Sequence, residues 1–282
     1  MVKTLYVSDL DGTLLRRDET LSRFTVDTIN ALVERGMIFS YATARSLVTA
    51  SKVTAGLSTK IPVIIYNGSF IKQSGTGETL LSNAFTQAQS DEIIDFLLQR
   101  EVFPIVYAMI GGVEKFSYCA DRESRGTKLF NDTRRGDVRD NPTVSPTDLF
   151  RGEVFHITCI DEEEILRPIY EHFKDTYQCI FHRDIYSGEQ WLEIQPIEAT
   201  KAKAIRALAK LLGCDRIICF GDGKNDISMF EIADECYAVE NADRALKAIA
   251  TAIIGSNEQD GVARWLGENF KIQKKGEHHA NI

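Results

Sequence analysis

The sequence predicts an α/β fold in which a doubly wound, mostly parallel sheet is interrupted by an inserted α+β domain. Near both ends of the chain, apolar segments typical of buried strands alternate with segments of helical apolar spacing. Hairpin patterns replace this alternation in the middle of the chain, and two acidic loops directly follow predicted strands. We therefore expect a core formed by residues 1–82 and 188–282, with an inserted α/β domain at residues 83–187.

Length and composition indicate a folded, water-soluble chain. Its 282 residues exceed the roughly 150 of an average domain, and 44% of them are hydrophobic. A net charge of −8 repels a phosphate backbone, so nucleic acid is not an expected partner. The six cysteines include no C-x-x-C pair, which argues against a zinc or disulfide framework. Without a signal peptide or a long apolar run, we expect a cytoplasmic protein without membrane contact, either a monomer or a homodimer.

The first part of the chain has the pattern of parallel-sheet units. Residues 4–7 are rich in β formers, residues 22–35 have helical apolar spacing, and residues 38–42 are again strand-like. After a helix predicted at residues 47–55, the unbroken apolar run at residues 63–66 is typical of a strand buried on both faces. The sheet is therefore expected to be parallel.

The segment after Asn67-Gly68 has the mixed pattern of an α+β domain. A hairpin is predicted across residues 70–81 and a second one at Gly111-Gly112. A polar stretch that ends near residue 151 is expected to be irregular. The remaining elements predicted here are helices at residues 91–100 and 162–174 and strands at residues 154–159 and 179–182.

The core pattern resumes after the insertion. The predicted elements are strands at residues 191–195, 217–220 and 237–239 and helices at residues 200–212, 226–233, 242–250 and 261–270. The polar tail that contains His278 and His279 is typical of a frayed terminus.

Two carboxylates, Asp9 and Asp11, lie where the first predicted strand ends, and Gly12 allows the backbone to turn sharply. Ligands of parallel α/β sheets bind at the carboxyl ends of the strands. Converging carboxylates repel one another unless a divalent cation, a cationic side chain or protonation stabilises them. The same residues also fit an Asx turn that only closes a strand, so the pair alone does not decide between a site and a turn.

A second acidic loop, at residues 221–226, directly follows the strand predicted at residues 217–220. Its G-x-G start lacks the third glycine of a dinucleotide fingerprint and the full pattern of a P-loop. Two acidic loops at strand ends indicate one site for a hard cation with oxygen ligands.

Two further segments offer groups that bind phosphate. Thr43-Ala44-Arg45-Ser46 provides a hydroxyl and amide donors at a predicted helix N-terminus, where the helix dipole favours anions. Threonine and serine are also ordinary helix caps. Lys201, at the start of the next predicted helix, is compatible with a solvated surface lysine as well as with a functional one.

Taken in order, these motifs resemble those of the haloacid dehalogenase (HAD) superfamily of phosphohydrolases, specifically its Cof-type members, which carry a large α/β cap between two halves of a Rossmann-like core. The resemblance covers the core from end to end. Its motifs are D-x-D-G-T at residues 9–13, the threonine loop at residues 43–45, Asn67-Gly68, Glu193-Ile194-Gln195-Pro196 leading to Lys201, G-D-G-x-N-D at residues 221–226, and the closing segment at residues 256–263.

The resemblance implies a Mg²⁺-dependent phosphatase that acts on a small phosphorylated metabolite. A sugar phosphate is the leading substrate class, followed by a phosphorylated cofactor. Asp9 would attack phosphorus to form an aspartyl-phosphate, and Asp11 would act first as the acid and then as the base. The implied Mg²⁺ ligands are Asp9, the backbone carbonyl of Asp11, Asp222 and Asp226. The implied phosphate-binding groups are the backbone amides of Leu10 and Ala44 and the side chains of Thr43, Lys201 and Asn225.

The chain departs from the family pattern at two places. Ala44 stands where the threonine loop usually has glycine, and Glu198-Ala199 and Ala202 flank the lysine where the pattern has G-V and G. Alanine still donates its backbone amide, so activity is expected to survive. Glu198 adds negative charge near the phosphate side.

Two other functions share these residues. A phosphomutase uses the same phospho-aspartate and returns the phosphoryl group to its substrate, while a sugar-phosphate sensor binds without turnover. A receiver-type switch module is disfavoured, because such modules lack an inserted domain and an acid two positions after the nucleophile. Arginines of the inserted domain are open candidates for substrate contact: Arg122, Arg125, Arg134, Arg135 and Arg183.

Overall fold

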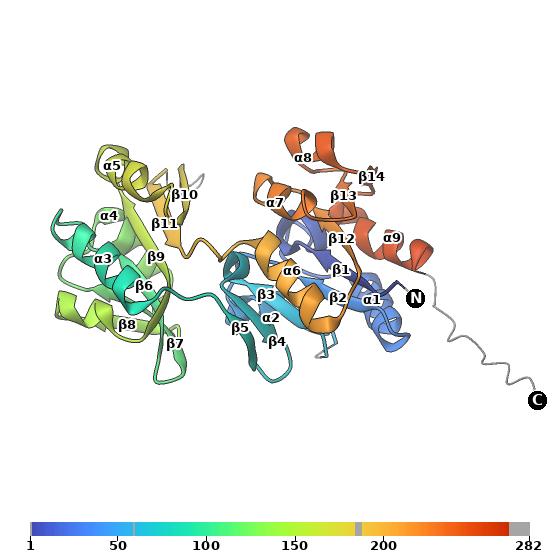
Figure 1. The fold of residues 1–282 in the computed structure, drawn as a ribbon, viewed down its shortest axis with the longest axis horizontal. Helices are drawn as coiled ribbons and strands as arrows, with labels where there is room; N and C mark the ends of the chain where they lie inside the picture. The colour runs from blue at the N-terminus through green and yellow to red at the C-terminus, as the bar shows by residue number, and fades with distance from the viewer. Residues whose placement is uncertain (1, 59, 184–187, 271–282) are drawn as a thin grey trace, which may run out of the picture. The chain divides into compact units, whose positions relative to one another are not determined.

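The chain folds into two units of different architecture (Figure 1). The computed structural model describes residues 2–58, 60–183 and 188–270, so His278 and His279 lie outside the described residues. One unit combines the chain up to Leu81 with the chain from Thr200 onward, and the other spans Ser82–Ala199. None of the helices in the described ranges is long and apolar enough to cross a lipid bilayer.

The first unit is built on a five-stranded sheet in which all neighbouring strands are parallel. Leu5 in the strand β1 (Thr4–Ser8) pairs with Ile38 on one side and with Ile217 on the other. The strands that follow β1 in the chain therefore lie first on one side of it and then on the other, so the strand order reverses at β1. Ligands of such sheets bind beside this reversal. In spatial order the strands are β14 (Ala252–Ile254), β13 (Glu235–Val239), β12 (Arg216–Gly221), β1 (Thr4–Ser8) and β2 (Ile38–Tyr41).

Helices flank this sheet, and α1 packs against α9 while α6 packs against α7 (Figure 1). The Ser22 and Thr200 side chains cap α1 and α6 by accepting a hydrogen bond from the backbone amide three residues further on. The helices of this unit are α1 (Arg23–Glu34), α2 (Leu47–Val53), α6 (Lys201–Leu212), α7 (Ile227–Phe230), α8 (Arg244–Ile249) and α9 (Gly261–Asn269).

A small sheet of β3 (Pro62–Ile65), β4 (Phe70–Gln73) and β5 (Thr79–Ser82) follows the first two helices. All four residues of β3 are buried, as its unbroken apolar run predicts. Ala42, just after β2, forms a parallel bridge to Ile64 of β3.

The second unit is a six-stranded sheet with helices packed against it. All its neighbouring strands are antiparallel except β7 and β8. In spatial order the strands are β10 (Gln178–Arg183), β11 (Gln190–Gln195), β9 (Glu153–Asp161), β6 (Ile105–Ile110), β7 (Val113–Cys119) and β8 (Asp140–Thr143). The helices are α3 (Gln87–Leu98), α4 (Arg125–Asp132) and α5 (Glu163–Phe173). The predicted α/β class with a parallel core and a separate α+β domain is thus confirmed.

The strand β11 corrects the expected boundary at residue 188. We expected this strand in the core, but it pairs with β10 and β9, and the first unit resumes only at Thr200. Leu192 and Ile194 are buried in the apolar core of the second unit. Apolar residues that alternate with polar ones predict a strand but not the sheet that it joins.

Three short elements were not predicted. The polar stretch expected to be irregular contains α4 and β8, and β14 was missed near the C-terminal end. β8 (Asp-Asn-Pro-Thr) has no apolar pattern and only one buried residue in four. β14 is apolar, but it is only three residues long and none of them is fully buried, so it gives too short a signal for a strand.

Candidate active site

Asp9 directly follows β1, at the carboxyl edge of the parallel sheet. Its backbone amide donates to the carbonyl of Phe220 in β12 at 2.9 Å, so strand pairing fixes the backbone at this point. Only 4% of the Asp9 surface is exposed. The chain then makes one wide turn over Leu10–Leu14, with Gly12 at a φ of 76°. Asp9 therefore lies on a backbone that strand pairing holds in place.

The loop after β12 brings two more carboxylates to Asp9, because β12 is the direct neighbour of β1. Oxygen atoms of Asp9, Asp222 and Asp226 all lie within 4.8 Å of one another. Asp226 is fully buried, and its Oδ2 accepts hydrogen bonds from the backbone amides of Asp222 and Gly223 at 3.0 Å each. A Cβ atom at Gly221 would lie 2.8 Å from that same oxygen, so the glycine leaves room for the carboxylate.

Asp9, Asp222 and Asp226 form an acidic cluster, and Lys201 supplies a positive side chain to it. Its Nζ lies 2.6 Å from Asp9 Oδ1 and 2.7 Å from Asp226 Oδ1, and only 2% of the residue is exposed. The interpretation as a solvated surface lysine is therefore excluded. A Cβ atom at Gly68 would lie 2.4 Å from the carbonyl oxygen of Thr200, so this glycine lets the two segments approach closely at the start of α6.

The cluster holds three carboxylates against one ammonium group. Burial raises the pKa of Asp9 to about 8, although the Lys201 ammonium opposes this shift. Burial and the neighbouring Asp226 raise the pKa of Asp222 to about 6. Burial by itself lowers the pKa of Lys201, but the Asp9 and Asp226 carboxylates raise it above its ordinary value, so the ammonium stays protonated.

The donor set fits a hard divalent cation. The three side chains offer oxygen ligands, the type that Mg²⁺ prefers, and Lys201 alone does not neutralise them. Asp222 is oriented by Thr13, whose hydroxyl donates to its Oδ1 at 3.0 Å. A Cβ atom at Gly12 would lie 2.3 Å from Asp222 Oδ2, so the glycine is required by the position of this carboxylate.

The Asp11 carboxylate is bound by Arg45. Arg45 Nε lies 2.9 Å from Asp11 Oδ2 and Nη2 lies 2.5 Å from Oδ1. Arg45 Nη2 also lies 2.9 Å from Glu19 Oε2. The sequence analysis gave Arg45 no role and did not single out Glu19, because no local pattern links the two positions.

The threonine loop at residues 43–45 begins next to Ser8, the residue before Asp9. The Ala42 amide donates to the Ser8 carbonyl at 2.9 Å, and the fully buried Thr43 follows. The structure thus brings this loop and the two acidic loops to one edge of the sheet. Of the other predicted phosphate-binding residues, Leu10 is fully buried, whereas Ala44 and Asn225 are exposed.

The closing segment fixes the turn that carries Asp11. Asn257 Nδ2 donates to the Leu15 carbonyl at 3.0 Å. Asn241, which the sequence analysis missed, donates to the Gly12 carbonyl at 2.7 Å. Both asparagines hold backbone carbonyls, a role without a short sequence signature.

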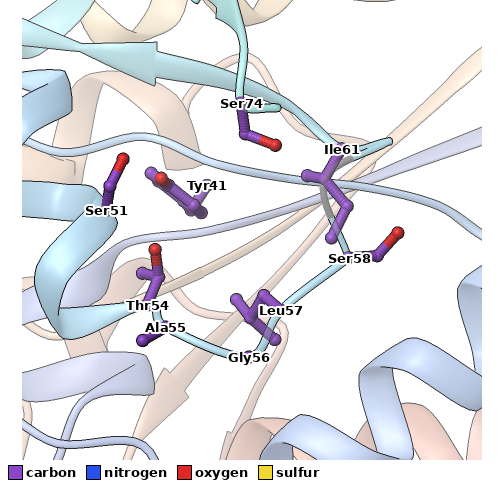
Figure 2. A pocket seen from close by; sticks show the side chains of 9 residues that line it. All are labelled: Tyr41, Ser51, Thr54, Ala55, Gly56, Leu57, Ser58, Ile61 and Ser74. Atoms are coloured by element: carbon purple, nitrogen blue, oxygen red, sulfur yellow. The ribbon is translucent and has the colours of Figure 1, made fainter. Parts of the chain in front are cut away.

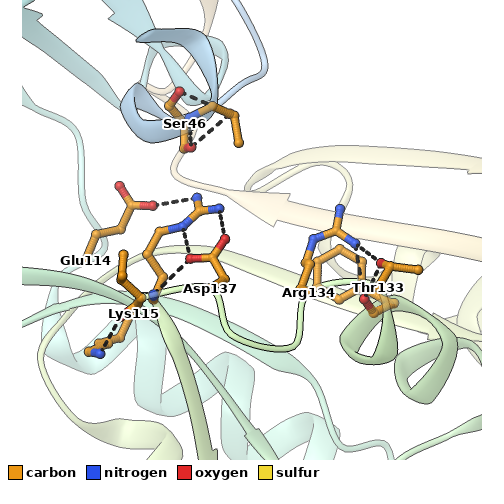
Figure 3. Close-up of polar contacts among 10 residues, drawn as sticks. Ser46, Glu114, Lys115, Thr133, Arg134 and Asp137 are labelled. Atoms are coloured by element: carbon orange, nitrogen blue, oxygen red, sulfur yellow. Dashed lines mark hydrogen bonds and ion pairs between the residues drawn. The ribbon is translucent and has the colours of Figure 1, made fainter. Parts of the chain in front are cut away.

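The candidate arginines of the second unit have partners within that unit. Arg134 donates to the Thr133 hydroxyl at 2.9 Å (Figure 3). Arg139, which the sequence analysis did not single out, is 7% exposed and pairs with Asp137 at 2.7 Å and Glu114 at 3.0 Å. Figure 3 labels these two acidic partners. The other pairs are Arg122 with Asp121, Arg125 with Glu189, Arg135 with Asp132, and Arg183 with Glu163. A substrate contact by any of these arginines stays a prediction.

The first unit contains a cavity of about 140 Å³ (Figure 2), and its lining includes no residue of the acidic cluster. Its lining is uncharged and rich in hydroxyl groups. The lining residues are Tyr41, Ser51, Thr54, Ala55, Gly56, Leu57, Ser58, Ile61 and Ser74. The cavity therefore lacks the charged groups that the candidate chemistry needs.

A family model and several known proteins match nearly the whole chain. The model of the haloacid dehalogenase-like hydrolase family matches residues 6–266. The 5-amino-6-(5-phospho-D-ribitylamino)uracil phosphatase YitU of Bacillus subtilis (strain 168) is 28% identical over 276 residues, which cover 95% of this chain and 98% of YitU. YwtE of the same organism, named for the same activity, is 26% identical over 283 residues, which cover 92% of this chain and 96% of YwtE.

Solved structures share the fold. The crystal structure of TM0651 from Thermotoga maritima has a TM-score of 0.78 at 24% identity and covers 97% of this chain and 99% of its own. The HAD subclass IIB sugar phosphatase BT4131 has a TM-score of 0.68 at 22% identity and covers 94% of this chain and 98% of its own.

The sheet that reverses at β1 and the acidic cluster at that reversal define an α/β protein with a carboxylate-lined candidate site. The chain belongs to the haloacid dehalogenase-like hydrolase family. The predicted family and the predicted enzyme class, a phosphatase, are therefore confirmed.

Proposed function

We propose that the protein is a cytoplasmic, Mg²⁺-dependent phosphatase that hydrolyses a small sugar phosphate through an aspartyl-phosphate at Asp9. The observation that carries this proposal is the buried Asp9 carboxylate, with the Lys201 ammonium 2.6 Å away and the Asp222 and Asp226 carboxylates close by. In phosphoryl transfer the protein mainly positions groups and neutralises charge. This cluster supplies a positioned oxygen nucleophile and a fixed cation.

In the first step, an Asp9 oxygen forms a bond to phosphorus while the bond between phosphorus and the leaving oxygen breaks. Asp11 gives its proton to that oxygen, so that a neutral alcohol departs. The protonated Lys201 lies where it stabilises negative charge on the phosphoryl oxygens. The other groups proposed to hold these oxygens are the backbone amides of Leu10 and Ala44, the Thr43 hydroxyl and the Asn225 amide.

In the second step, water attacks phosphorus and gives a proton to Asp11. The bond between phosphorus and Asp9 breaks, inorganic phosphate leaves, and Asp9 returns as a carboxylate. Asp11 is again protonated, and the cycle is complete.

Asp9, Asp222 and Asp226 are the side chains that would hold Mg²⁺, together with the backbone carbonyl of Asp11. When bound, the ion supplies positive charge to the phosphoryl oxygens and to the carboxylates. Burial favours the protonated form of Asp9, whereas the attack needs the ionised form. This conflict supports the need for a cation in addition to Lys201.

The substrate class is supported by the names of related proteins. YitU and YwtE are named for a substrate with a phosphorylated ribityl group, and BT4131 is named a sugar phosphatase. A phosphorylated ribityl group and a sugar phosphate are both phosphorylated carbon chains that carry several hydroxyl groups. We extend this class to the present protein, with phosphorylated cofactors as the next class to test.

Release of inorganic phosphate tests the proposal. The panel contains sugar phosphates, ribitol phosphate, nucleotides and pyridoxal phosphate, each with Mg²⁺ and with a chelator. Asp9→Asn keeps the size of the side chain and is expected to reduce turnover at least about 10³-fold without loss of folding. Retained turnover in Asp9→Asn would remove Asp9 as the nucleophile.

The same panel separates the alternatives. A phosphoryl group recovered on another hydroxyl of the substrate, rather than as free phosphate, would identify a mutase. Saturable binding of a sugar phosphate without any turnover in Mg²⁺ would identify a sensor.

A further inference from the structure

Arg45 is shared between two carboxylates of the segment that follows β1. Its guanidinium binds Asp11 with two nitrogens, at 2.9 Å and 2.5 Å, and Nη2 also lies 2.9 Å from Glu19 Oε2. The backbone of Arg45 is fixed on both sides, because its amide donates to Thr43 Oγ1 at 3.1 Å and its carbonyl accepts from the Tyr66 amide at 3.0 Å. A guanidinium on a fixed backbone therefore has two anionic partners at once.

Glu19 meets Arg45 from a strained turn. Its φ of 60° lies in the left-handed region, which is unfavourable for a residue other than glycine. The turn is held by a hydrogen bond from the Glu19 amide to the Arg16 carbonyl at 3.0 Å and by Asp18, whose Oδ1 accepts from the Thr20 amide at 3.1 Å. Strained backbone that persists in this way is enriched at functional sites.

The ion pair between Arg45 and Asp11 opposes the role proposed for Asp11. A carboxylate held by two guanidinium nitrogens cannot at the same time reach a leaving oxygen. The Asp11 side chain is half exposed, but that of Arg45 is only 19% exposed. Leaving a largely buried guanidinium without an acceptor is costly. Glu19 already contacts Nη2, so a second acceptor is in place before Asp11 leaves.

We propose that Glu19 is a positioning residue that retains Arg45 while the Asp11 carboxylate turns from Arg45 to the leaving oxygen. This inference rests on the proposed function. Glu19 itself does not touch the substrate. Without it, Arg45 holds Asp11 more tightly, and the orientation of Asp11 that can donate a proton is less populated.

The variant Glu19→Gln tests this role, because a neutral amide oxygen is a much weaker partner of the guanidinium than a carboxylate. The Glu19 side chain is 63% exposed, so the substitution is expected to leave folding intact. The matched control is Asp18→Asn, which removes the same charge from the same turn, while its amide oxygen still accepts the bonds from Thr20. Both variants and the wild type are measured with saturating Mg²⁺.

The readout is single-turnover release of the alcohol from two aromatic phosphate monoesters. The p-nitrophenolate of p-nitrophenyl phosphate leaves without a proton, whereas the alkoxide of benzyl phosphate needs one from Asp11. Glu19→Gln is expected to slow benzyl alcohol release about tenfold and p-nitrophenol release less than about twofold, with KM for both within about twofold of wild type. Asp18→Asn is expected to match wild type with both probes.

Several outcomes would overturn the inference alone, provided that the wild type is active. These are an unchanged rate in Glu19→Gln, an equal loss with both probes, the same loss in Asp18→Asn, or a change confined to KM. Release of neither alcohol by the wild type, together with no phosphate release from any compound of the panel in Mg²⁺, would instead overturn the proposed function, and this inference with it.

Discussion

The Nζ of Lys201 lies 2.6 Å from Asp9 Oδ1, although 192 positions separate the two residues in the chain. The same Nζ lies 2.7 Å from Asp226 Oδ1, and all three residues are nearly inaccessible to solvent. The carboxyl edge of the sheet therefore holds a buried ion-paired cluster made from both ends of the sequence.

Removal of the ammonium group is expected to make stability depend on pH. Loss of one partner from a buried ion pair costs about 3–5 kcal/mol. A carboxyl whose pKa is raised in the folded state, as burial does for Asp9, contributes stability below its unfolded pKa and loses it as pH rises through the folded pKa. Lys201→Met should therefore be destabilised by about 3 kcal/mol at pH 8 and by less at pH 5, in urea unfolding with a chelator.

The matched control for that substitution is Lys210→Met, in the exposed part of the same helix. It should change the free energy of unfolding little at either pH. A deficit of equal size at pH 5 and pH 8 in Lys201→Met would contradict the ion-pair explanation.

Gly12→Ala is expected to weaken Mg²⁺ binding. A Cβ atom at this position would lie 2.3 Å from Asp222 Oδ2 and displace the carboxylate. Gly213→Ala is the control, because Gly213 also has a positive φ, of 64°, but nothing lies within 4 Å of its added Cβ. Both variants should lose about 1 kcal/mol of stability. Only Gly12→Ala should raise the Mg²⁺ dissociation constant, by about tenfold or more, in isothermal titration calorimetry. Equal Mg²⁺ affinity in both variants would argue against Asp222 as a ligand.

Asp222→Asn is expected to change stability in opposite directions with and without metal. In a chelator the variant should be more stable than wild type, because one of three mutually repelling acids becomes neutral. In the wild type, Mg²⁺ at a hundredfold excess over its dissociation constant adds about 2.7 kcal/mol. The variant should lose most of this gain in thermal unfolding, whereas the exposed Asp175→Asn should retain it. A full Mg²⁺ response in Asp222→Asn would place the ion elsewhere.

Glu193 is expected to make the free energy of unfolding of the protein depend on pH through the second unit. Burial raises its pKa to about 7, above the unfolded value of about 4.3. Its contribution to stability is therefore complete below about pH 4.3 and is lost as pH rises through about 7. Glu193→Gln should gain stability relative to wild type between pH 5 and pH 8, measured by urea unfolding. The lowered pKa of His156, about 4, is common to both proteins and cancels in the difference.

The control for the Glu193 experiment is Glu164→Gln, at an exposed position of α5. Its difference from wild type should not vary with pH. A flat difference for Glu193→Gln as well would contradict the raised pKa.

The core of the fold was predictable because its strands carry a strong physical signal. β3 and most of β12 are unbroken apolar runs, and runs of this kind are typical of parallel strands covered on both faces. β11 alternates apolar and polar residues only from Leu192 to Gln195, as any strand with one covered face can, so its sequence does not specify a sheet. β8 and α4 were missed because few of their residues are apolar.

The acidic cluster was predictable because Asp9 and the loop at residues 221–226 directly follow strands that end at one sheet edge. The burial of Lys201 was not predictable from local pattern, since its contacts are with Asp9 and Asp226, 192 and 25 positions away in the chain. The contact between Glu19 and Arg45 depends on a turn conformation and two side-chain orientations, which no periodic pattern encodes.

The pairing of β1 with β12 also fixes the order in which the protein matures during synthesis. Thr4 pairs with Arg216, so β1 leaves the ribosome long before β12 exists. Ser82–Ala199 is continuous and is complete before any of β12 has been made. A nascent chain therefore carries Asp9 before Lys201 and Asp226 have been made, and the acidic cluster can assemble only after β12 and the loop that follows it have been synthesised.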